Sequence, residues 1–383
     1  MCCARRATRK DAIAPTAKLP NGQDPVLGLT GPPDTDGSRL GERAPSPGGR
    51  WPVKIGRVEH ADRAWVVGLP KAEVHVHLEG CVPLEVVGPT DNVSGSMAIG
   101  SLSQLLSHLD QLCRRVQRAD QLATIASQLS GRARDGGVRH VDVIMNPSHW
   151  PSWRGRLGDM VEALDAPWRR DDAAGGPSVG LCVSLSRTQS EAEAMARVEE
   201  VIALDHPRVV GLSLDGNEAH GSHNERFARA FARAAEAGLH RCVHAGESGG
   251  PDGVREAVEL LGAERIDHGI RCVEDPDLVR DLAQHGIPLD VCPSSNVALG
   301  VVANLASHPI ERLRRAGVAV SVNTDDPLLY GIDLVGEYQR CADAFGWGRS
   351  ELGEVARTSV MSSFAPPERR RAILAELDRY LSW

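Results

Sequence analysis

Two histidines separated by one residue, His75 and His77, form the first group in the sequence that could do chemistry. They end a short apolar run, Ala72–His77, which has the composition of a β-strand. Side chains alternate across a strand, so the two imidazoles share one face and can bind a single metal ion. Alone, this spacing also fits two histidines in a protein core, so the interpretation depends on which polar residues can join them.

Three further predicted strands end in residues of the same chemical kind. His244 and Glu247 follow one apolar run, His268 ends the next, and Asp325 and Asp326 follow the last. Each could instead be a polar residue at the start of a helix, since aspartate and threonine cap helices well. Together, however, they can converge on one point, because the carboxyl ends of parallel barrel strands meet at one mouth. The two adjacent aspartates diverge, so we expect them to have different tasks.

A metal site is the chemistry that this convergent set favours. It offers three imidazole nitrogens and one carboxylate oxygen, with room for water, which suits Zn²⁺ in an open catalytic site. A bound zinc ion lowers the pKa of its water to about 7. No lysine follows Lys71, which excludes a lysine-bridged two-metal site and a Schiff base from the later strands. The predicted ligands are His75, His77, His244 and Asp325.

The elements that position these residues alternate in type along the chain. From about Trp65 onward, short apolar runs alternate with segments that have apolar residues at helical spacing. Eight such units predict an α/β fold, a (β/α)8 barrel. A doubly wound open sheet is the alternative, but no Gly-x-Gly-x-x-Gly follows the first strand. The predicted strands are Ala72–His77, Val138–Met145, Ser178–Ser184, Val209–Leu214, His240–His244, Arg265–His268, Ile287–Cys292 and Val318–Asn323.

The first 65 residues differ from the rest of the chain. They are rich in Gly, Pro, Asp and Arg and lack apolar periodicity, which predicts a disordered leader. Residues 66–383 are then expected to form the barrel domain. The last segment, Ser350–Trp383, has a helical pattern that Pro366 and Pro367 interrupt.

The bulk composition of the 383 residues limits the kinds of partner that the protein is expected to bind. The net charge is −8 and no basic stripe occurs, so we expect no nucleic-acid partner. No apolar stretch reaches the length of a membrane span, so we expect no membrane partner. The nine cysteines contain no Cys-x-x-Cys pair, and several of them (Cys182, Cys242 and Cys292) lie in apolar runs, which suits reduced thiols in the cytoplasm. The oligomeric state is left open.

Five motifs, in this order, resemble the adenosine and adenine deaminase family of the amidohydrolase superfamily. The resemblance extends from about Leu69 to the C-terminus. It implies a hydrolytic deaminase that acts on a small purine and holds one Zn²⁺ per subunit. The motifs are Lys71–Gly80, His244–Glu247, Arg265–Gly269, Cys292–Asn296 and Asn323–Pro327.

The resemblance also implies a role for each site residue. Glu247 protonates the purine ring nitrogen next to the amino-bearing carbon, and His268 orients or stabilises the attacking hydroxide. Asp326 holds the attacking water and hydrogen-bonds the imidazole part of the purine. Gly216 offers its backbone N–H to the purine, and Glu79 lies near the sugar. The four predicted metal ligands are the zinc ligands of the family.

The resemblance does not decide which purine is the substrate. The segment Leu214–Glu218 reads Leu-Asp-Gly-Asn-Glu, a blend of adenosine-type Leu-Ala-Gly-Asp-Glu and adenine-type Leu-Asp-Ser-Ser-Glu. We expect adenosine or 2′-deoxyadenosine, with adenine or a modified adenosine such as aminodeoxyfutalosine as the alternative. Glu79→Ala is then expected to cripple a nucleoside enzyme and spare an enzyme for the free base.

Two segments near the site depart from the family pattern. The region after the first strand is short, so a helix over Ser101–Val116 is expected either to cover the sugar side or simply to pack on the barrel. The second strand ends in Asn146–Trp150 instead of the usual Val-Arg-x-x-Pro, which leaves its packing open. Two other functions stay as competitors: an esterase or lactonase on the same barrel, and a non-catalytic purine-binding relative.

Overall fold

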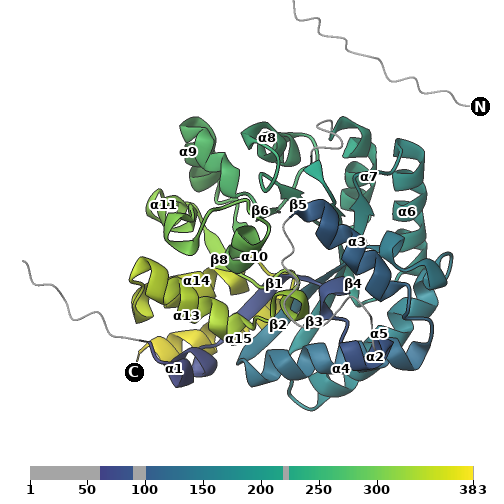
Figure 1. Ribbon diagram of the computed structural model, residues 1–383, viewed down its shortest axis with the longest axis horizontal. Helices are drawn as coiled ribbons and strands as arrows, with labels where there is room; N and C mark the ends of the chain where they lie inside the picture. Colours follow the sequence, from purple (N-terminus) through teal and green to yellow (C-terminus); the bar gives the residue numbers. More distant parts are fainter. Residues whose placement is uncertain (1–60, 89–100, 219–223, 383) are drawn as a thin grey trace, which may run out of the picture. The chain divides into compact units, whose positions relative to one another are not determined.

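A computed structural model describes residues 61–88, 101–218 and 224–382 (Figure 1). Of the predicted leader, residues 1–60 lie outside the described part. The end of that leader belongs to the fold instead, because helix α1 (Arg63–Gly68) begins there. Asp62 caps this helix by accepting a hydrogen bond from the backbone N–H of Trp65 at 2.8 Å. The folded part therefore starts before residue 65, which corrects the predicted boundary.

Eight parallel strands form one sheet in the order β1 to β8. A bridge between Val76 and Asp325 joins the last strand to the first. Here His77 N–H donates to the Asp325 carbonyl at 2.8 Å, and Asp325 N–H donates to the His75 carbonyl at 3.1 Å. The predicted (β/α)8 barrel is thus confirmed. Its strands are β1 (Lys71–His77), β2 (Val138–Met145), β3 (Ser178–Ser186), β4 (Val209–Asp215), β5 (His240–Ala245), β6 (Arg265–His268), β7 (Leu289–Val291) and β8 (Val320–Val322).

Helices surround this barrel, and most lie between consecutive strands (Figure 1). Strand β7 is shorter than the predicted run Ile287–Cys292, because Pro288 has no N–H and Pro293 begins a helix. The α-helices after α1 are α2 (Leu84–Val87), α3 (Leu102–Cys113), α4 (Ala119–Asp135), α5 (Leu157–Ala173), α6 (Glu191–Leu204), α7 (Glu225–Glu236), α8 (Pro251–Glu259), α9 (Pro276–His285), α10 (Pro293–Ala298), α11 (Ile310–Arg315), α12 (Pro327–Tyr330), α13 (Leu334–Phe345), α14 (Arg349–Ser362) and α15 (Pro367–Leu381). Short 3-10 turns are η1 (Glu79–Cys81), η2 (Pro147–His149), η3 (Pro151–Trp153), η5 (Ile270–Glu274) and η6 (Leu305–Ser307).

Local sequence explains where several of these helices begin and end. Ser190 and Glu193 form a capping box at the start of α6, each accepting from the other's backbone N–H. Asp275 caps α9 just before a proline, and Gly286 ends that helix with φ 66°. These caps fix the lengths of the helices, and so the points at which the chain re-enters the barrel.

A charged cluster fills the barrel interior near the amino ends of the strands, which we call the lower end. Arg265 is fully buried there and pairs with Asp142 at 2.6 Å and with Asp290 at 2.9 Å. Its guanidinium also lies 3.9 Å from the ring centroid of Phe364, which comes from the segment between α14 and α15. Since β2, β6 and β7 supply the three charges, this cluster ties strands together across the interior.

Lys71 also lies at the lower end and is buried. Its ammonium donates to the backbone carbonyls of Val66, Leu69 and Gly136 at 2.8, 3.1 and 2.6 Å. Burial and the nearby Arg139 lower its pKa to about 7. The lysine therefore holds the entry of β1 and stands at the opposite end of that strand from His77.

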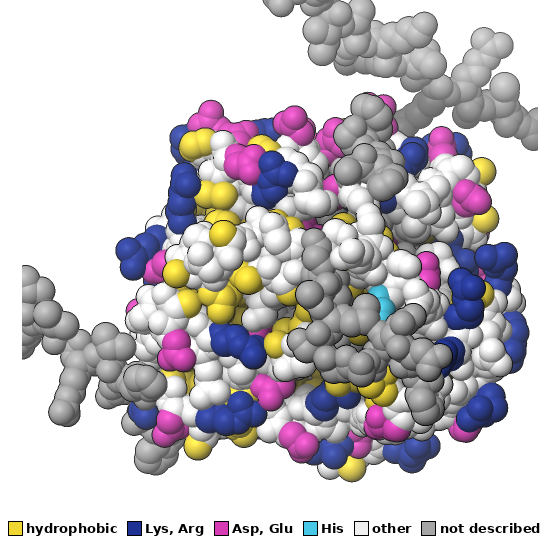
Figure 2. All heavy atoms as spheres, viewed as in Figure 1, with side chains coloured by type: hydrophobic (Ala, Val, Ile, Leu, Met, Phe, Trp, Pro, Cys, Tyr) yellow, Lys and Arg dark blue, Asp and Glu magenta, His cyan; other side chains and the backbone are white. Residues whose placement is uncertain are grey.

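Basic and acidic side chains are interspersed on the face shown in Figure 2. Among the described residues, no helix combines the length and the apolar character that crossing a bilayer requires.

Candidate active site

Four predicted metal ligands meet at the carboxyl ends of the strands, which we call the upper end. His75 and His77 come from β1, His244 from β5, and Asp325 from the turn after β8. The Nε2 atoms of His77 and His244 lie 3.0 Å apart. The nearest carboxylate oxygen, Oδ1 of Asp325, lies 3.4 Å from Nε2 of His77 and 3.6 Å from Nε2 of His75. All four residues are buried.

The spacing of these atoms fits a zinc ion. In a tetrahedral site with bonds of 2.0–2.1 Å, neighbouring donor atoms lie about 3.3 Å apart. The distances from His77 to His244 and from Asp325 to His75 and His77 range from 3.0 to 3.6 Å, and donor atoms of the three histidines all lie within 4.8 Å of one another. Nε2 of His75 is buried and has no hydrogen-bond partner among the described residues. Such an atom needs a partner, and a metal at the centre of the set would be one.

Backbone strain accompanies this convergence. Asp325 and His268 have φ values of 64° and 66°, in the left-handed region that residues with a Cβ seldom adopt. Asp325 is held in this conformation by its backbone bonds to β1 and by Ser295, whose hydroxyl donates to its Oδ2 at 2.6 Å. Strain of this kind is characteristic of functional sites.

The two adjacent aspartates do diverge. Asp326 lies against Gly80, where an added Cβ would come within 2.1 Å of Oδ1 and 2.4 Å of the Asp326 Cα. Only glycine fits at position 80 while Asp326 keeps this place. Oδ1 of Asp326 is buried without a hydrogen-bond partner in the part of the chain that the structure describes.

Glu247 lies beside the metal-binding set. Its Oε1 is 3.6 Å from Nε2 of His268, and Asn296 Nδ2 approaches Oε1 at 3.4 Å and His268 Nδ1 at 3.2 Å. Burial, and then the negative charges of Asp325 and Glu218, raise the pKa of Glu247 to about 8. The carboxyl is therefore mainly protonated at neutral pH, the state that a general acid requires.

Glu218 holds the loop that carries Glu247, a role that the sequence did not reveal. Its carboxylate accepts four backbone N–H bonds, from Gly246, Glu247, Ser248 and Gly249, at 2.8 to 3.0 Å. The only signal in the sequence was an acidic residue at the end of the segment Leu214–Glu218. Nothing in that segment indicates that its partner is a loop about 30 residues away.

The remaining predicted residues line a pocket above the metal-binding set. Glu79, Asp326, Gly216 and the metal-facing residues enclose a cavity of about 40 Å³. Gly216 has a φ of 99°, which requires glycine. Helix α3 lies in front of the strands in Figure 1, and its leucines form the apolar wall. The wall consists of four leucines of α3, Leu102, Leu105, Leu106 and Leu109, together with Leu299 from the end of α10. Helix α3 therefore covers the site, which was one of the two alternatives expected for this segment.

The unusual segment after β2 braces Glu79. Oε1 of Glu79 accepts from the Asn146 backbone N–H at 2.9 Å and from Trp150 Nε1–H at 2.6 Å. Oε2 is buried and lacks a hydrogen-bond partner in the described residues. Burial raises the pKa of Glu79 to about 7. His149 from the same segment lines the pocket and pairs with Asp110 of α3 at 2.7 Å, so it links the wall to the barrel.

Comparison with known proteins decides the family. The sequence model of the adenosine deaminase family matches residues 89–380. The chain belongs to the adenosine deaminase family. It is accordingly a hydrolase that acts on carbon–nitrogen bonds, a hydrolytic deaminase of the adenine and adenosine type.

Similar proteins within this family and its superfamily cover more than four fifths of the chain. An adenine deaminase of Rhodopseudomonas palustris is 32% identical over 340 residues, which span 83% of this chain and 96% of that protein. The crystal structure of an adenine deaminase from Arthrobacter aurescens is 31% identical, with a TM-score of 0.76, and covers 82% of this chain and all of that one. An amidohydrolase from Burkholderia ambifaria with bound zinc is 25% identical, with a TM-score of 0.74, and covers 86% of this chain and 96% of that one.

Proposed function

We propose that this member of the deaminase family hydrolyses adenine to hypoxanthine and ammonia with one zinc ion. The sequence favoured adenosine and gave adenine as the alternative. Similarity to adenine deaminases over more than four fifths of the chain supports the alternative. Asp215 in the Leu214–Glu218 segment agrees with it, because aspartate is the adenine-type residue at that position.

The observation that carries the proposed reaction is the protonated acid beside the metal-binding set. Water must add to the ring carbon that bears the amino group, and this addition is slow because it breaks aromaticity. Glu247 can protonate the neighbouring ring nitrogen and make that carbon electrophilic. Its raised pKa, near 8, supplies the proton at neutral pH. An esterase or lactonase has no need of such an acid beside a single metal.

The other side chains share the handling of water and protons. A zinc ion held by His75, His77, His244 and Asp325 would lower the pKa of a bound water to about 7. His268 and Asp326 line the same pocket and would position the attacking water. A carbon–oxygen bond forms, the carbon–nitrogen bond breaks, and the two water protons end on the ring nitrogen and on ammonia.

The part of the pocket lining formed by Glu79 and Asp215 favours a free base over a nucleoside as the substrate. Adenine carries an N–H on its imidazole ring, and a nucleoside has a sugar in its place. Oε2 of Glu79 is a buried acceptor without a hydrogen-bond partner among the described residues, and Asp215 lines the same pocket. These carboxyl groups would accept that N–H. Glu79→Ala cannot separate base from nucleoside, since it also leaves the donors on Asn146 and Trp150 without their acceptor.

The direct test is ammonia release by the zinc-loaded protein. Adenine, adenosine, 2′-deoxyadenosine and aminodeoxyfutalosine are compared at equal concentration, with Glu247→Gln as the control. We expect adenine to have the largest kcat/KM and the control to be inactive. Faster turnover of a nucleoside would keep the reaction and overturn the choice of adenine. No ammonia from any substrate, with zinc shown to be bound, would overturn the reaction.

We propose the cytoplasm as the compartment. All seven cysteines among the described residues are buried free thiols: Cys81, Cys113, Cys182, Cys242, Cys272, Cys292 and Cys341. Unpaired buried thiols suit a reducing compartment.

A further inference from the structure

We infer that Asp267 is a positioning residue for the metal-binding set. Its carboxylate accepts the Nδ1–H of His244 and thereby leaves Nε2 of that ring to bind the metal. The inference rests on the proposed function, because it takes His244 as a metal ligand. Neither the sequence motifs nor their resemblance gave Asp267 a role.

The geometry places Asp267 directly beside His244. The two residues are paired in the ladder between β5 and β6. Oδ2 of Asp267 lies 3.2 Å from Nδ1 of His244. Asp267 is fully buried, and neither of its oxygens nor Nδ1 of His244 has a hydrogen-bond partner elsewhere in the described ranges, so these facing atoms are each other's available partners. His244 is therefore its principal contact.

The nearby arginine does not explain this buried carboxylate. Arg265 is two residues away in the same strand, but its guanidinium pairs with Asp142 and Asp290 and donates to the Val74 carbonyl. A buried carboxylate is costly unless a donor satisfies it. The imidazole N–H of His244 is the donor at hand, so the contact stabilises the charge and fixes the ring.

The contact also selects the tautomer of His244. A neutral imidazole carries one N–H, and an ionised carboxylate can only accept, so the proton resides on Nδ1. The lone pair is then on Nε2, which faces Nε2 of His77 at 3.0 Å. His75 is oriented in the same way, with Nδ1 at 3.0 Å from the Asp290 backbone carbonyl. Of these two rings, His244 is the one whose Nδ1 faces a carboxylate, and His75 is the one whose Nδ1 faces a backbone carbonyl.

The test measures zinc affinity, by competition with a chelator, in Asp267→Ala and Asp267→Asn. Loss of a carboxylate behind a ligating histidine typically weakens metal binding by about 10–100-fold. We expect a loss in this range for Asp267→Ala and a smaller one for Asp267→Asn, because the amide oxygen still accepts the N–H. The matched control is Asp142→Asn, which removes another fully buried carboxylate that pairs with Arg265, at a residue in β2 whose partners are not metal ligands. Its affinity should stay within about threefold of the unchanged protein.

Two further readouts separate positioning from a purely structural role. Thermal unfolding of the metal-free variants shows whether each is folded at the temperature of the titration. The absorption spectrum of the cobalt-loaded protein reports ligand geometry, and it should change in Asp267→Ala and not in Asp142→Asn. Unaltered affinity and spectrum in folded Asp267→Ala, or equal losses in Asp142→Asn, would overturn the inference alone. Failure of the unchanged protein to bind zinc would overturn the proposed function together with it.

Discussion

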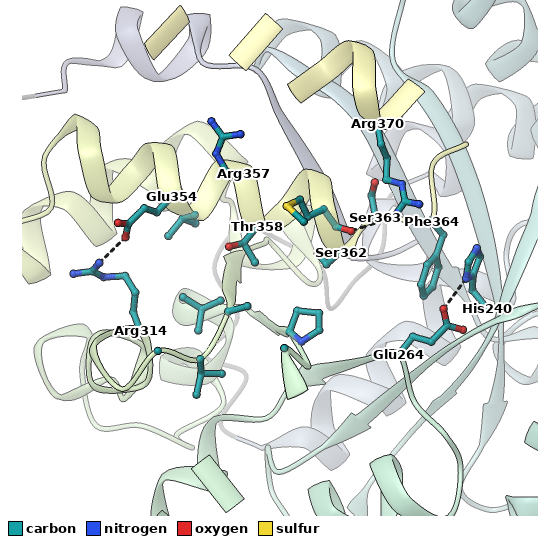
Figure 3. A pocket seen from close by; sticks show the side chains of 18 residues that line it. His240, Glu264, Arg314, Glu354, Arg357, Thr358, Ser362, Ser363, Phe364 and Arg370 are labelled. Carbon is teal, nitrogen blue, oxygen red and sulfur yellow. Dashed lines mark hydrogen bonds and ion pairs between the residues drawn. The ribbon is translucent and has the colours of Figure 1, made fainter. Parts of the chain in front are cut away.

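The two ends of the barrel differ in how their polar groups are satisfied. At the lower end, a cavity of about 550 Å³ is lined mainly by uncharged residues and contains two pairs of oppositely charged side chains (Figure 3). His240 pairs with Glu264 at 2.9 Å, and Arg314 with Glu354 at 2.7 Å. At the upper end the cavity is about 40 Å³, yet His75 Nε2, Glu79 Oε2 and Asp326 Oδ1 are buried without hydrogen-bond partners in the described part of the chain.

The comparison teaches that cavity size does not mark the site of chemistry in this barrel. A buried polar atom without a partner costs free energy, so several such atoms around one cavity favour a site that a ligand completes. The upper end also contains the left-handed residues His268 and Asp325. At the lower end Arg265 has ion-pair partners in Asp142 and Asp290, and Phe364 stacks on His240 at 4.4 Å. It is built for stability.

The largest expected difference between the ends concerns their glutamates. Glu247→Gln keeps the shape of the side chain and removes its acidic proton, so kcat should fall by about 10²–10⁴-fold. Glu264→Gln at the lower end should leave kcat within about twofold. Steady-state rates with adenine compare the two variants. If Glu247→Gln kept a rate similar to that of Glu264→Gln, Glu247 would not be the acid of the reaction.

A smaller loss of activity is expected from Gly80→Ala. The new Cβ would meet the backbone and side chain of Asp326, and a displacement of about 1 Å can cost about 10²-fold in rate. Gly131→Ala in α4 is the matched control, since nothing lies within 4 Å of its added Cβ. It should keep full kcat/KM and gain about 0.5–1 kcal/mol of stability. Equal activity of Gly80→Ala and Gly131→Ala would contradict the tight fit at Asp326.

Phe364→Ala should instead affect stability. Removing a buried phenylalanine typically costs about 3–5 kcal/mol, and here it also uncovers Arg265 and His240. Denaturant unfolding should show this loss, while the activity of the folded fraction stays close to that of the unchanged protein. A variant with unchanged stability and a low kcat would place the lower end in the reaction after all.

The two glutamates should also respond to pH with opposite signs. The raised pKa of Glu247 makes its ionisation unfavourable in the folded state, so the stability of the metal-free protein is lost as pH rises from about 4.5 to about 8. Burial alone would raise the pKa of Glu264, but the hydrogen bond and charge of His240, with Arg241, lower it. That carboxylate stabilises the fold above its ordinary pKa, and this stabilisation is lost in acid.

Unfolding free energies measured from pH 4 to 9 should therefore show Glu247→Gln gaining and Glu264→Gln losing stability relative to the unchanged protein as pH rises. The same sign for both would contradict the assigned environments.

The smallest effect is expected at the wall of the upper cavity. Asp110→Asn weakens the contact between α3 and His149, and a partly exposed ion pair contributes at most about 1 kcal/mol. KM for adenine should rise about two- to fivefold with kcat unchanged. A matching fall in kcat would show that the pair also orients the reacting groups.

The sequence alone determined the features that depend on local geometry. The strand run Ala72–His77 places two imidazoles on one face because side chains alternate with period two. The leucine spacing of Ser101–Val116 predicted a helix that the structure contains as α3. The order of the motifs indicated the barrel and its family. The predicted leader extended into helix α1, because the cap and start of that helix lie in a segment of weak apolar pattern.

Tertiary structure decided the contacts that join distant parts of the chain. Glu218 reaches the loop of Glu247, Asp267 faces His244, and Asp325 bonds to β1 some 250 positions away in sequence. No spacing rule predicts such pairs, because they depend on the register of all eight strands and on closure of the barrel. Packing of the whole interior sets that register, and the same packing determines which buried atoms are left to meet a metal ion and a purine.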